Sequence, residues 1–354
     1  MKNYLFDGQK LMYHPGRVSE FLKRGDCFPL YMEISPVGRC NHRCVFCAYD
    51  FLGHPDRMLD TKRLITFIDE IAKAGVKSVL FAGEGEPLLH PDIDRLVIRA
   101  KEKGIDSGIY TNGHLLGGDL SKRILPYLTF IRFSVNGGTR ENYARVHNVK
   151  PAVFDLVVAN IRCAAGLKKK GLDLDIGVQY VLLPENKDHL IPAIETLKKA
   201  GIDYFVIKPF VQQSFRQSYK MRHQFAVDEI RGILEHAERY SDKRFKVIAR
   251  KESFEHYGKR NYSHCYGTAF VSVLNSAGDI ASCLPYWDKK DYVFGNIYRD
   301  SFEKIWNGRR RMRIKRRLEQ EIDARRCPPN CRPHAVNELL CELKNPTVRH
   351  LNFV

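Results

Sequence analysis

The sequence predicts an α/β protein built from parallel βαβ units. Between residues 28 and 210, short runs rich in β-branched and aromatic residues alternate with amphipathic runs of helical length. Glycines mark the joints between the runs, as turns require. The polar loops that follow the first four β-type runs lie where parallel sheets and barrels place their chemistry, at the carboxyl ends of the strands.

The elements follow in order along the chain. Strands are expected at 29–35, 76–82, 106–111, 130–135, 175–182 and 204–209, and helices at 61–74, 92–103, 119–127, 151–170 and 187–200. A polar connector at 211–224 and a helix at 226–241 follow, and a hairpin with its turn at 276–279 comes after residue 260. We therefore divide the chain into an N-terminal extension (1–27), a core (28–210), a connector with one helix (211–259) and a cysteine-bearing domain (260–354).

The composition is that of a globular protein, with 44% hydrophobic and 28% charged residues among 354. No apolar run has the length of a signal peptide's core or of a membrane span, so we expect a cytoplasmic protein without a membrane partner. In that compartment the ten cysteines are expected to be metal ligands or redox groups rather than disulfides.

The formal net charge is +17, which favours acidic partners. Seven basic residues stand between Arg309 and Arg317 without an acid among them. The run is either a contact surface for phosphate or nucleic acid or the solvated face of a helix. No signature of an RNA-binding fold accompanies it, so we do not expect a nucleic-acid partner.

The stretch "GRCNHRCVFC" places three cysteines, Cys40, Cys44 and Cys47, within eight positions. Zinc and cubane iron–sulfur clusters normally take four protein ligands. His42 lies between the first two cysteines and is expected to be too cramped to join them. A cluster held by three thiolates would keep one iron open for a small molecule, as catalytic metals do.

The Cys-x3-Cys-x2-Cys spacing, with Phe46 directly before the third cysteine, resembles the signature of the radical S-adenosylmethionine (SAM) superfamily. The resemblance implies a partial (β/α)6 barrel of the TIM type and a [4Fe–4S] cluster whose open iron binds SAM. It also implies reductive cleavage of SAM to a 5′-deoxyadenosyl radical that takes a hydrogen atom from the substrate, with flavodoxin or ferredoxin as electron donor.

Two loops resemble further motifs of that superfamily. In "GEGEP", the residues Gly85, Glu86 and Pro87 align with the family's "GGEP" element, which receives the amino group of SAM. Glycine lets backbone groups approach closely, and a carboxylate pairs with an ammonium group. Asn112, in "YTNG", falls in the element beside the cofactor at the end of the third strand.

The later strands supply the remaining candidates for the cofactor site. "FSVNGG" resembles the family's "SxDG", which places Ser134 and Asn136 on the ribose or carboxylate of SAM, with Asn136 where Asp is more usual. Arg145 either neutralises the SAM carboxylate or lies on the surface. Lys208, at the end of the sixth strand, is expected to face the pocket and to contact the substrate.

A second cysteine group lies in the C-terminal domain, where Gly278 stands five residues before Cys283. This spacing resembles the C-x(9–15)-G-x4-C start of the SPASM/twitch extension of radical SAM enzymes. The tail has five cysteines instead of seven, which favours a single auxiliary [4Fe–4S] cluster, although zinc remains an alternative. The ligands so implied are Cys265, Cys283, Cys327 and Cys331.

Three cysteines remain outside both groups. Cys341 is either a fifth residue of the second site or a buried helix cysteine. Cys27 and Cys163 are expected to be structural.

An auxiliary cluster can accept an electron from a substrate radical, and the single-cluster layout resembles that of a radical SAM dehydrogenase of aminocyclitol biosynthesis. The leading hypothesis is therefore a dehydrogenase-like oxidoreductase. Its small-molecule substrate would be a sugar, cyclitol or sugar nucleotide that is oxidised, epimerised or rearranged. The basic excess suits a phosphorylated carbohydrate.

Two alternatives come from other classes. One is a peptide- or protein-modifying SPASM enzyme similar to the maturases, although the roughly 28 residues before the first strand are few for a leader-binding domain. The other is an RNA-binding metalloprotein that uses the Arg309–Arg317 run.

Overall fold

The computed structural model describes residues 8–212, 218–219, 225, 227–255, 259–287, 289–328 and 331–353. Ten strands form one sheet. Its parallel strands are β1 (Tyr31–Ile34), β2 (Ser78–Phe81), β3 (Asp106–Thr111), β4 (Phe130–Ser134), β5 (Asp175–Leu182), β6 (Tyr204–Pro209), β7 (Lys246–Ala249) and β8 (Val271–Leu274). Two antiparallel strands, β9 (Asp279–Ala281) and β10 (Val293–Asn296), extend the β8 edge.

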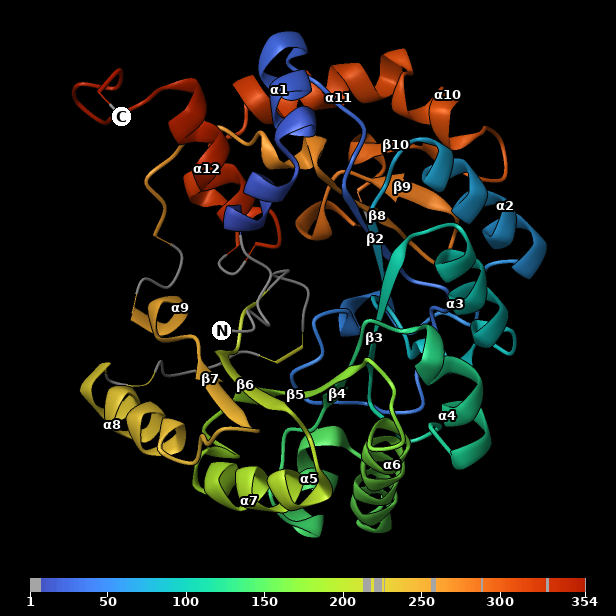
Figure 1. Ribbon diagram of the computed structural model, residues 1–354, viewed down its shortest axis with the longest axis vertical. Coiled ribbons are helices and arrows are strands. Elements are labelled where there is room, and N and C mark those ends of the chain that lie inside the picture. Colours follow the sequence, from blue (N-terminus) through green and yellow to red (C-terminus); the bar gives the residue numbers. More distant parts are fainter. Residues whose placement is uncertain are drawn as a thin grey trace.

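Helices surround this curved sheet on its outer side (Figure 1). They are α1 (Pro15–Arg24), α2 (Thr61–Lys73), α3 (Ile93–Glu102), α4 (Gly118–Ile124), α5 (Arg140–His147), α6 (Ala152–Lys168), α7 (Leu190–Ala200), α8 (Val227–Glu238), α9 (Lys251–Glu255), α10 (Phe302–Trp306), α11 (Arg309–Gln320) and α12 (His334–Lys344).

The predicted fold class, a partial TIM-like α/β barrel, is confirmed. All six predicted strands and the five helices between them are present, with boundaries that differ by a few residues. The structure adds β7, from a segment predicted as connector, and α5, from a segment predicted as loop. Most of the predicted connector at 211–224 lies outside the described residues.

The strand order is β10-β9-β8-β1-β2-β3-β4-β5-β6-β7. The predicted hairpin is therefore β8 and β9, and Gly278 in its turn has a φ of 85°, which suits glycine. Strand β8 also pairs with β1, so the auxiliary hairpin continues the core sheet. The described strands β7 and β8 are not paired with each other, and the barrel stays open along this seam.

Side chains alternate between the helix layer and the barrel interior, as the pleat of a strand requires. Met32 and Ile34 of β1 are fully buried in the main hydrophobic core, whereas Glu33 between them contacts interior residues. Large rings occupy the interior where a neighbouring strand carries glycine. A Cβ on Gly177 would lie 2.1 Å from the ring of Tyr204, its register partner.

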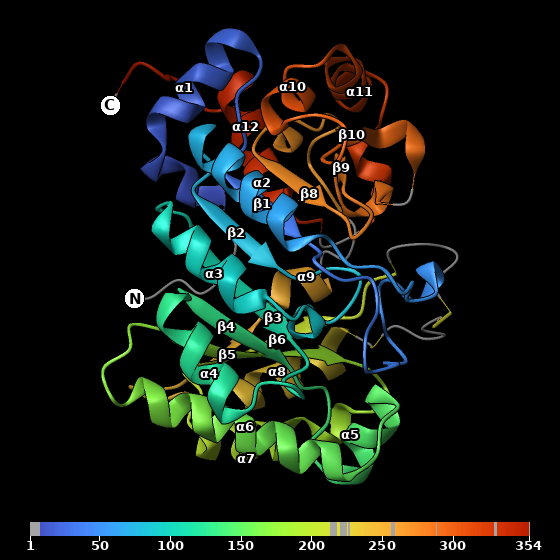
Figure 2. The ribbon, with the colours of Figure 1, turned by 90° about the vertical axis from the view of Figure 1, so that its right-hand side faces the viewer.

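The N-terminal extension folds against the C-terminal domain, and α1 lies close to α12 in both views (Figures 1 and 2). Phe21 of α1 is fully buried, and its ring lies 5.3 Å from that of Phe270 and 6.1 Å from that of Tyr266. Burying such rings removes a large apolar area from water. The domain boundaries assigned from the sequence stay a prediction.

The basic run forms helix α11, as the helix interpretation predicts. Four of its basic residues are exposed, but Arg311 is buried and donates two hydrogen bonds to Asp26, at 2.7 and 2.8 Å. Its guanidinium carbon also lies 3.7 Å from the ring centroid of Trp306. Part of the basic excess thus serves internal packing.

Among the described residues, every helix is too short or too polar to span a bilayer.

Candidate functional site

The loop after β1 carries the first cysteine group at the carboxyl edge of the sheet. Cys40, Cys44 and Cys47 are free, partly buried thiols that act on one another electrostatically. Burial raises the pKa of Cys40 to about 12, that of Cys47 to about 11 and that of Cys44 well above its usual value. A metal that displaces the thiol protons would bind the resulting thiolates, and three thiols on one loop are a donor set that fits a metal centre.

The "GEGEP" loop after β2 packs directly on the cysteine loop. A Cβ on Gly85 would lie 2.1 Å from the backbone oxygen of Arg39 and 2.7 Å from that of Val37. The backbone N–H of Glu86 donates to the same Arg39 oxygen at 3.1 Å. The glycine of this motif is therefore needed for contact between the two loops.

Glu86 is the buried carboxylate of this region, with 3% of its surface exposed. It accepts hydrogen bonds from the Thr111 hydroxyl at 2.7 Å, the Asn112 N–H at 2.8 Å and the Leu88 N–H at 3.1 Å. Burial raises its pKa to about 6, and no described cation forms an ion pair with it. A buried carboxylate in this setting suits a ligand ammonium group, which is the role predicted for it.

The other predicted SAM contacts lie at neighbouring strand ends. Asn112 donates to Asn41 at 2.7 Å, and its amide nitrogen lies 3.9 Å from the Cys40 sulfur. Asn136 is fully buried, accepts from the Val181 N–H at 2.5 Å and donates to the Ser134 hydroxyl at 3.2 Å. Its side chain thus already links β4 to β5.

Pro87 and Arg145 differ in their surroundings. Pro87 is buried at the start of a short 3-10 helix. Arg145 is exposed on α5 and donates to the backbone oxygen of Glu185 at 2.9 Å. The sequence left both a surface role and a cofactor role open for Arg145. Its hydrogen bond to Glu185 is a contact within the protein and does not decide between the two roles.

His147, at the end of α5, was not identified from the sequence. Its Nδ1 lies 3.2 Å from the Cys44 sulfur, and its Nε2 lies 3.0 Å from the backbone nitrogen of Asn136. Because a backbone N–H can only donate, Nε2 must accept, which leaves the proton on Nδ1, facing the sulfur. Burial lowers the pKa of His147 well below its usual value, so the ring is neutral.

The sequence did contain a signal for this helix. Tyr143, Val146 and His147 follow a helical spacing, and all three are buried. The Tyr143 ring stacks on that of His147 at 4.1 Å. His42 also lies closer than expected, since one ligand atom each of His42, Cys44 and His147 fall within 4.8 Å of one another. His42 thus lies near Cys44, and the expectation that it does not join the three cysteines as a ligand stays a prediction.

The second cysteine group is assembled from three separate segments of the tail. Burial raises the pKa of all four thiols, and Cys283 interacts electrostatically with Cys331, Cys265 and Cys327. Arg260 fixes the loop beside them by donating to the backbone oxygens of Ala324, at 2.9 Å, and Cys327, at 2.7 Å. The four thiols predicted as auxiliary ligands thus lie close enough to act on one another electrostatically, and their role as ligands stays a prediction.

Cys341 lies on α12 and is partly buried. Its sulfur is 3.8 Å from the backbone oxygen of His264 and 3.8 Å from the side-chain nitrogen of Asn337. Both interpretations of Cys341, a fifth residue of the second site and a helix cysteine, stay predictions. Cys27 is buried, as expected for a structural cysteine.

Glu84 joins the two halves of the site and was also missed. Its buried carboxylate accepts from the Trp287 indole N–H at 2.5 Å, from the Ser276 N–H at 3.1 Å and from the Ser276 hydroxyl. Arg57 completes the cluster with a contact of 3.2 Å. The loop that carries Glu86 is therefore tied to the auxiliary hairpin and to the segment after Cys283.

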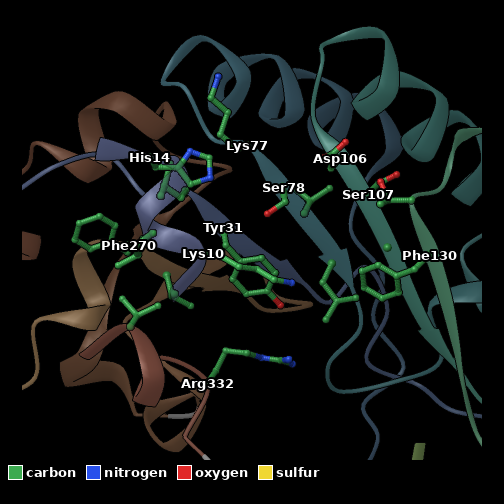
Figure 3. A pocket seen from close by; sticks show the side chains of 18 of the residues that line it. Lys10, His14, Tyr31, Lys77, Ser78, Asp106, Ser107, Phe130, Phe270 and Arg332 are labelled. Atoms are coloured by element: carbon green, nitrogen blue, oxygen red, sulfur yellow. The ribbon is translucent and has the colours of Figure 1, made fainter. Parts of the chain in front are cut away.

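A cavity of about 370 Å³ lies at the opposite end of the barrel (Figure 3). The first residues of β1, β2, β3 and β4 line it, and Arg332 extends toward it from the C-terminal domain. Barrel enzymes carry out their chemistry at the carboxyl ends of the strands. The cysteine loops stand at that other end, so this cavity is not the reaction site.

These features define an iron–sulfur enzyme whose α/β barrel carries one three-thiol loop and one set of four thiols. Residues 34–197 match the model of the radical SAM superfamily, and residues 265–332 match that of the SPASM iron–sulfur cluster-binding domain. The chain belongs to the radical SAM superfamily, with SAM and a [4Fe–4S] cluster as cofactors and auxiliary cluster binding in its C-terminal part.

Relatives that match this chain over different lengths carry different names. A tungsten-containing aldehyde ferredoxin oxidoreductase cofactor-modifying protein of Pyrococcus furiosus is 24% identical over 299 residues, which cover 79% of this chain and 81% of that protein. A PqqA peptide cyclase of Granulibacter bethesdensis is 27% identical over 175 residues, 49% of this chain and 45% of that one.

A similar fold occurs in SuiB of Streptococcus suis, solved with its precursor peptide SuiA. The TM-score is 0.66 at 19% identity, over 87% of this chain and 71% of that one. The similarity confirms the partial-barrel fold.

Proposed function

We propose that this radical SAM enzyme modifies a peptide or protein, the alternative hypothesis of the sequence analysis, rather than a free carbohydrate. The observation that carries the proposal is the open seam between the described strands β7 and β8. A closed barrel admits substrates only through its ends, whereas an open side gives an extended chain a path into the interior. On the β8 side, the auxiliary cysteine Cys283 follows β9, the strand that pairs with β8.

Two of the three named relatives support the same hypothesis. One is a peptide cyclase, and one structure with this fold contains a precursor peptide. These names describe the relatives and not this chain, and they indicate that peptides are the substrates to test first.

We assign roles to the residues as follows. Cys40, Cys44 and Cys47 hold the cluster that binds SAM, and Glu86 receives the SAM ammonium group. The bound cluster and SAM supply a radical that removes a hydrogen atom from the substrate. The remaining candidates, Gly85, Pro87, Asn112, Ser134, Asn136 and Arg145, surround the cofactor, and the auxiliary ligands are Cys265, Cys283, Cys327 and Cys331.

The auxiliary site gives the electron balance of the reaction. In all, the peptide would give up one hydrogen atom, one electron and one proton, and a cluster held by the four auxiliary thiols would supply the chemistry that accepts the electron, while the proton goes to solvent. A new double bond or a crosslink between two residues forms, and the product is about two mass units lighter. An external donor, flavodoxin or ferredoxin, supplies the electron that starts each turnover.

A second candidate is the oxidation or rearrangement of a phosphorylated sugar, cyclitol or sugar nucleotide. The net charge of +17 favours it, because a basic protein attracts phosphate esters. The same cofactors would serve, and only the substrate differs.

The test uses anaerobically reconstituted enzyme with SAM, a reductant and peptides encoded beside its gene. We expect 5′-deoxyadenosine and a peptide about two mass units lighter, with about eight irons per chain. Cys44→Ala should abolish both products, whereas Cys163→Ala, outside both cysteine groups, should retain them. SAM cleavage that responds to nucleotide sugars and to no peptide would select the second candidate.

A further inference from the structure

Two cations stand side by side at the carboxyl edge of the barrel. Lys208 lies at the end of β6, and Arg250 directly follows β7. The Arg250 N–H donates to the Ile207 oxygen at 3.0 Å, which fixes the two residues side by side. Both side chains are partly buried, and neither forms a hydrogen bond or ion pair within the described part of the chain.

Glu33 is the carboxylate that acts electrostatically on Lys208, and it already has a cationic partner, while Glu252 acts on Arg250 without an ion pair between them among the described residues. Glu33 accepts from the Arg332 guanidinium at 2.6 Å. Burial lowers the pKa of Lys208 to about 7, and the nearby positive charges of Arg250, Arg332 and Arg132 lower it further. Among the groups that act on Lys208, Glu33 raises the pKa. Burial and Arg332 lower the pKa of Arg250 as well. Holding like charges together in a partly buried site costs free energy unless an anion is bound there.

The position of this pair suits a substrate that approaches SAM. The neighbour of Lys208 in the sheet is Val181, whose N–H donates to Asn136 at the predicted SAM site. Arg250 follows β7, which forms one side of the open seam. A substrate entering along the seam would therefore meet the pair just before it reaches the cofactor.

We propose that Lys208 and Arg250 form a binding site for an oxyanion of the substrate. An ammonium and a guanidinium group together provide the charge and the several donors that carboxylates and phosphates require. The proposal rests on the proposed function for the source of the anion, which in a peptide is an acidic side chain or the C-terminal carboxylate. If the substrate is the phosphorylated carbohydrate of the second candidate function, the anion is a phosphate, which the same two cations would bind.

The experiment measures binding of small anions to the reconstituted enzyme with SAM present. The ligands are N-acetylglutamate methylamide, its glutamine counterpart and inorganic pyrophosphate. We expect Lys208→Met and Arg250→Met each to weaken anion binding at least about tenfold, while Lys246→Met, an exposed lysine at the start of β7, leaves it unchanged. A preference for the carboxylate or for pyrophosphate identifies the source of the anion.

Crystals soaked in selenate give a second measurement. Anomalous density between the two side chains supports the site, and its absence there overturns it. Equal binding by the glutamate and glutamine compounds, with no response to pyrophosphate, overturns it as well.

The SAM affinity separates this proposal from a simpler one. If the two cations bind the carboxylate of SAM itself, Lys208→Met will weaken SAM binding, and the substrate site is refuted. An unchanged SAM dissociation constant together with lost anion binding supports it. Failure of every peptide to be modified, with anion binding intact, would refute the proposed function and leave the oxyanion site standing.

Discussion

Replacing Glu84 by alanine tests whether the cysteine-loop half and the auxiliary half of the site depend on one buried carboxylate. The substitution leaves two buried N–H donors, those of Trp287 and Ser276, without their acceptor. Each unpaired buried donor costs about 1–3 kcal/mol, so we expect a loss of about 4 kcal/mol. Arg57 is 41% exposed and adds little, because water replaces its partner.

The assay is the thermal unfolding midpoint of the reconstituted protein. Unfolding entropy scales with chain length, and for a chain of this size about 4 kcal/mol corresponds to about 5 °C. Glu84→Gln keeps one acceptor oxygen and should lie between alanine and the original protein. Glu102→Gln, which alters an exposed ion pair with Arg99, is the control and should shift the midpoint by less than about 1 °C. A Glu84→Ala midpoint within about 1 °C of the original would refute the reasoning.

Three further predictions follow, two for the cofactor site and one for Lys208. Gly85→Ala forces a Cβ to 2.1 Å from a backbone oxygen of the cysteine loop and should remove about four of about eight irons, measured chemically, whereas Gly166→Ala, with open space around it, should remove none. His147→Leu removes the N–H that faces the Cys44 sulfur and should make the reduction potential of that cluster more negative in a spectroscopic titration; an unchanged potential would contradict the hydrogen bond. Lys208 binds its proton less firmly in the folded than in the unfolded protein, so the free energy of unfolding should rise from about pH 7 upward, by up to about 1 kcal/mol per unit. Urea midpoints at several pH values check this slope, which Lys208→Met should abolish.

Local patterns were sufficient for much of the fold and for both cysteine groups. The cysteine spacing and the glycine before Glu86 are short-range features, and the six strands are marked by their own composition. Strand β7 was missed because it starts with an exposed lysine and has only one buried residue, so its composition does not mark it as a core strand.

Contacts between distant residues could not be predicted in this way. Glu84 meets Ser276 and Trp287 across 192 and 203 positions, and no local pattern connects them. Lys208 was expected to face the pocket, but its neighbour Arg250 enters the site only because β7 pairs with β6. The pairing of β6 with β7 therefore brings the two positive charges of Lys208 and Arg250 together. The composition alone showed only that the chain has an excess of basic residues.

The pairing of β8 with β1 makes the C-terminal part necessary for the solubility of the core. β1 has β2 on one side and β8 on the other, so all its backbone groups face a partner strand. A chain cut before residue 260 would expose the N–H and C=O groups of Tyr31–Ile34 along a bare edge. Such edges are templates for association with other chains, and the truncated protein should aggregate rather than persist as an independent domain.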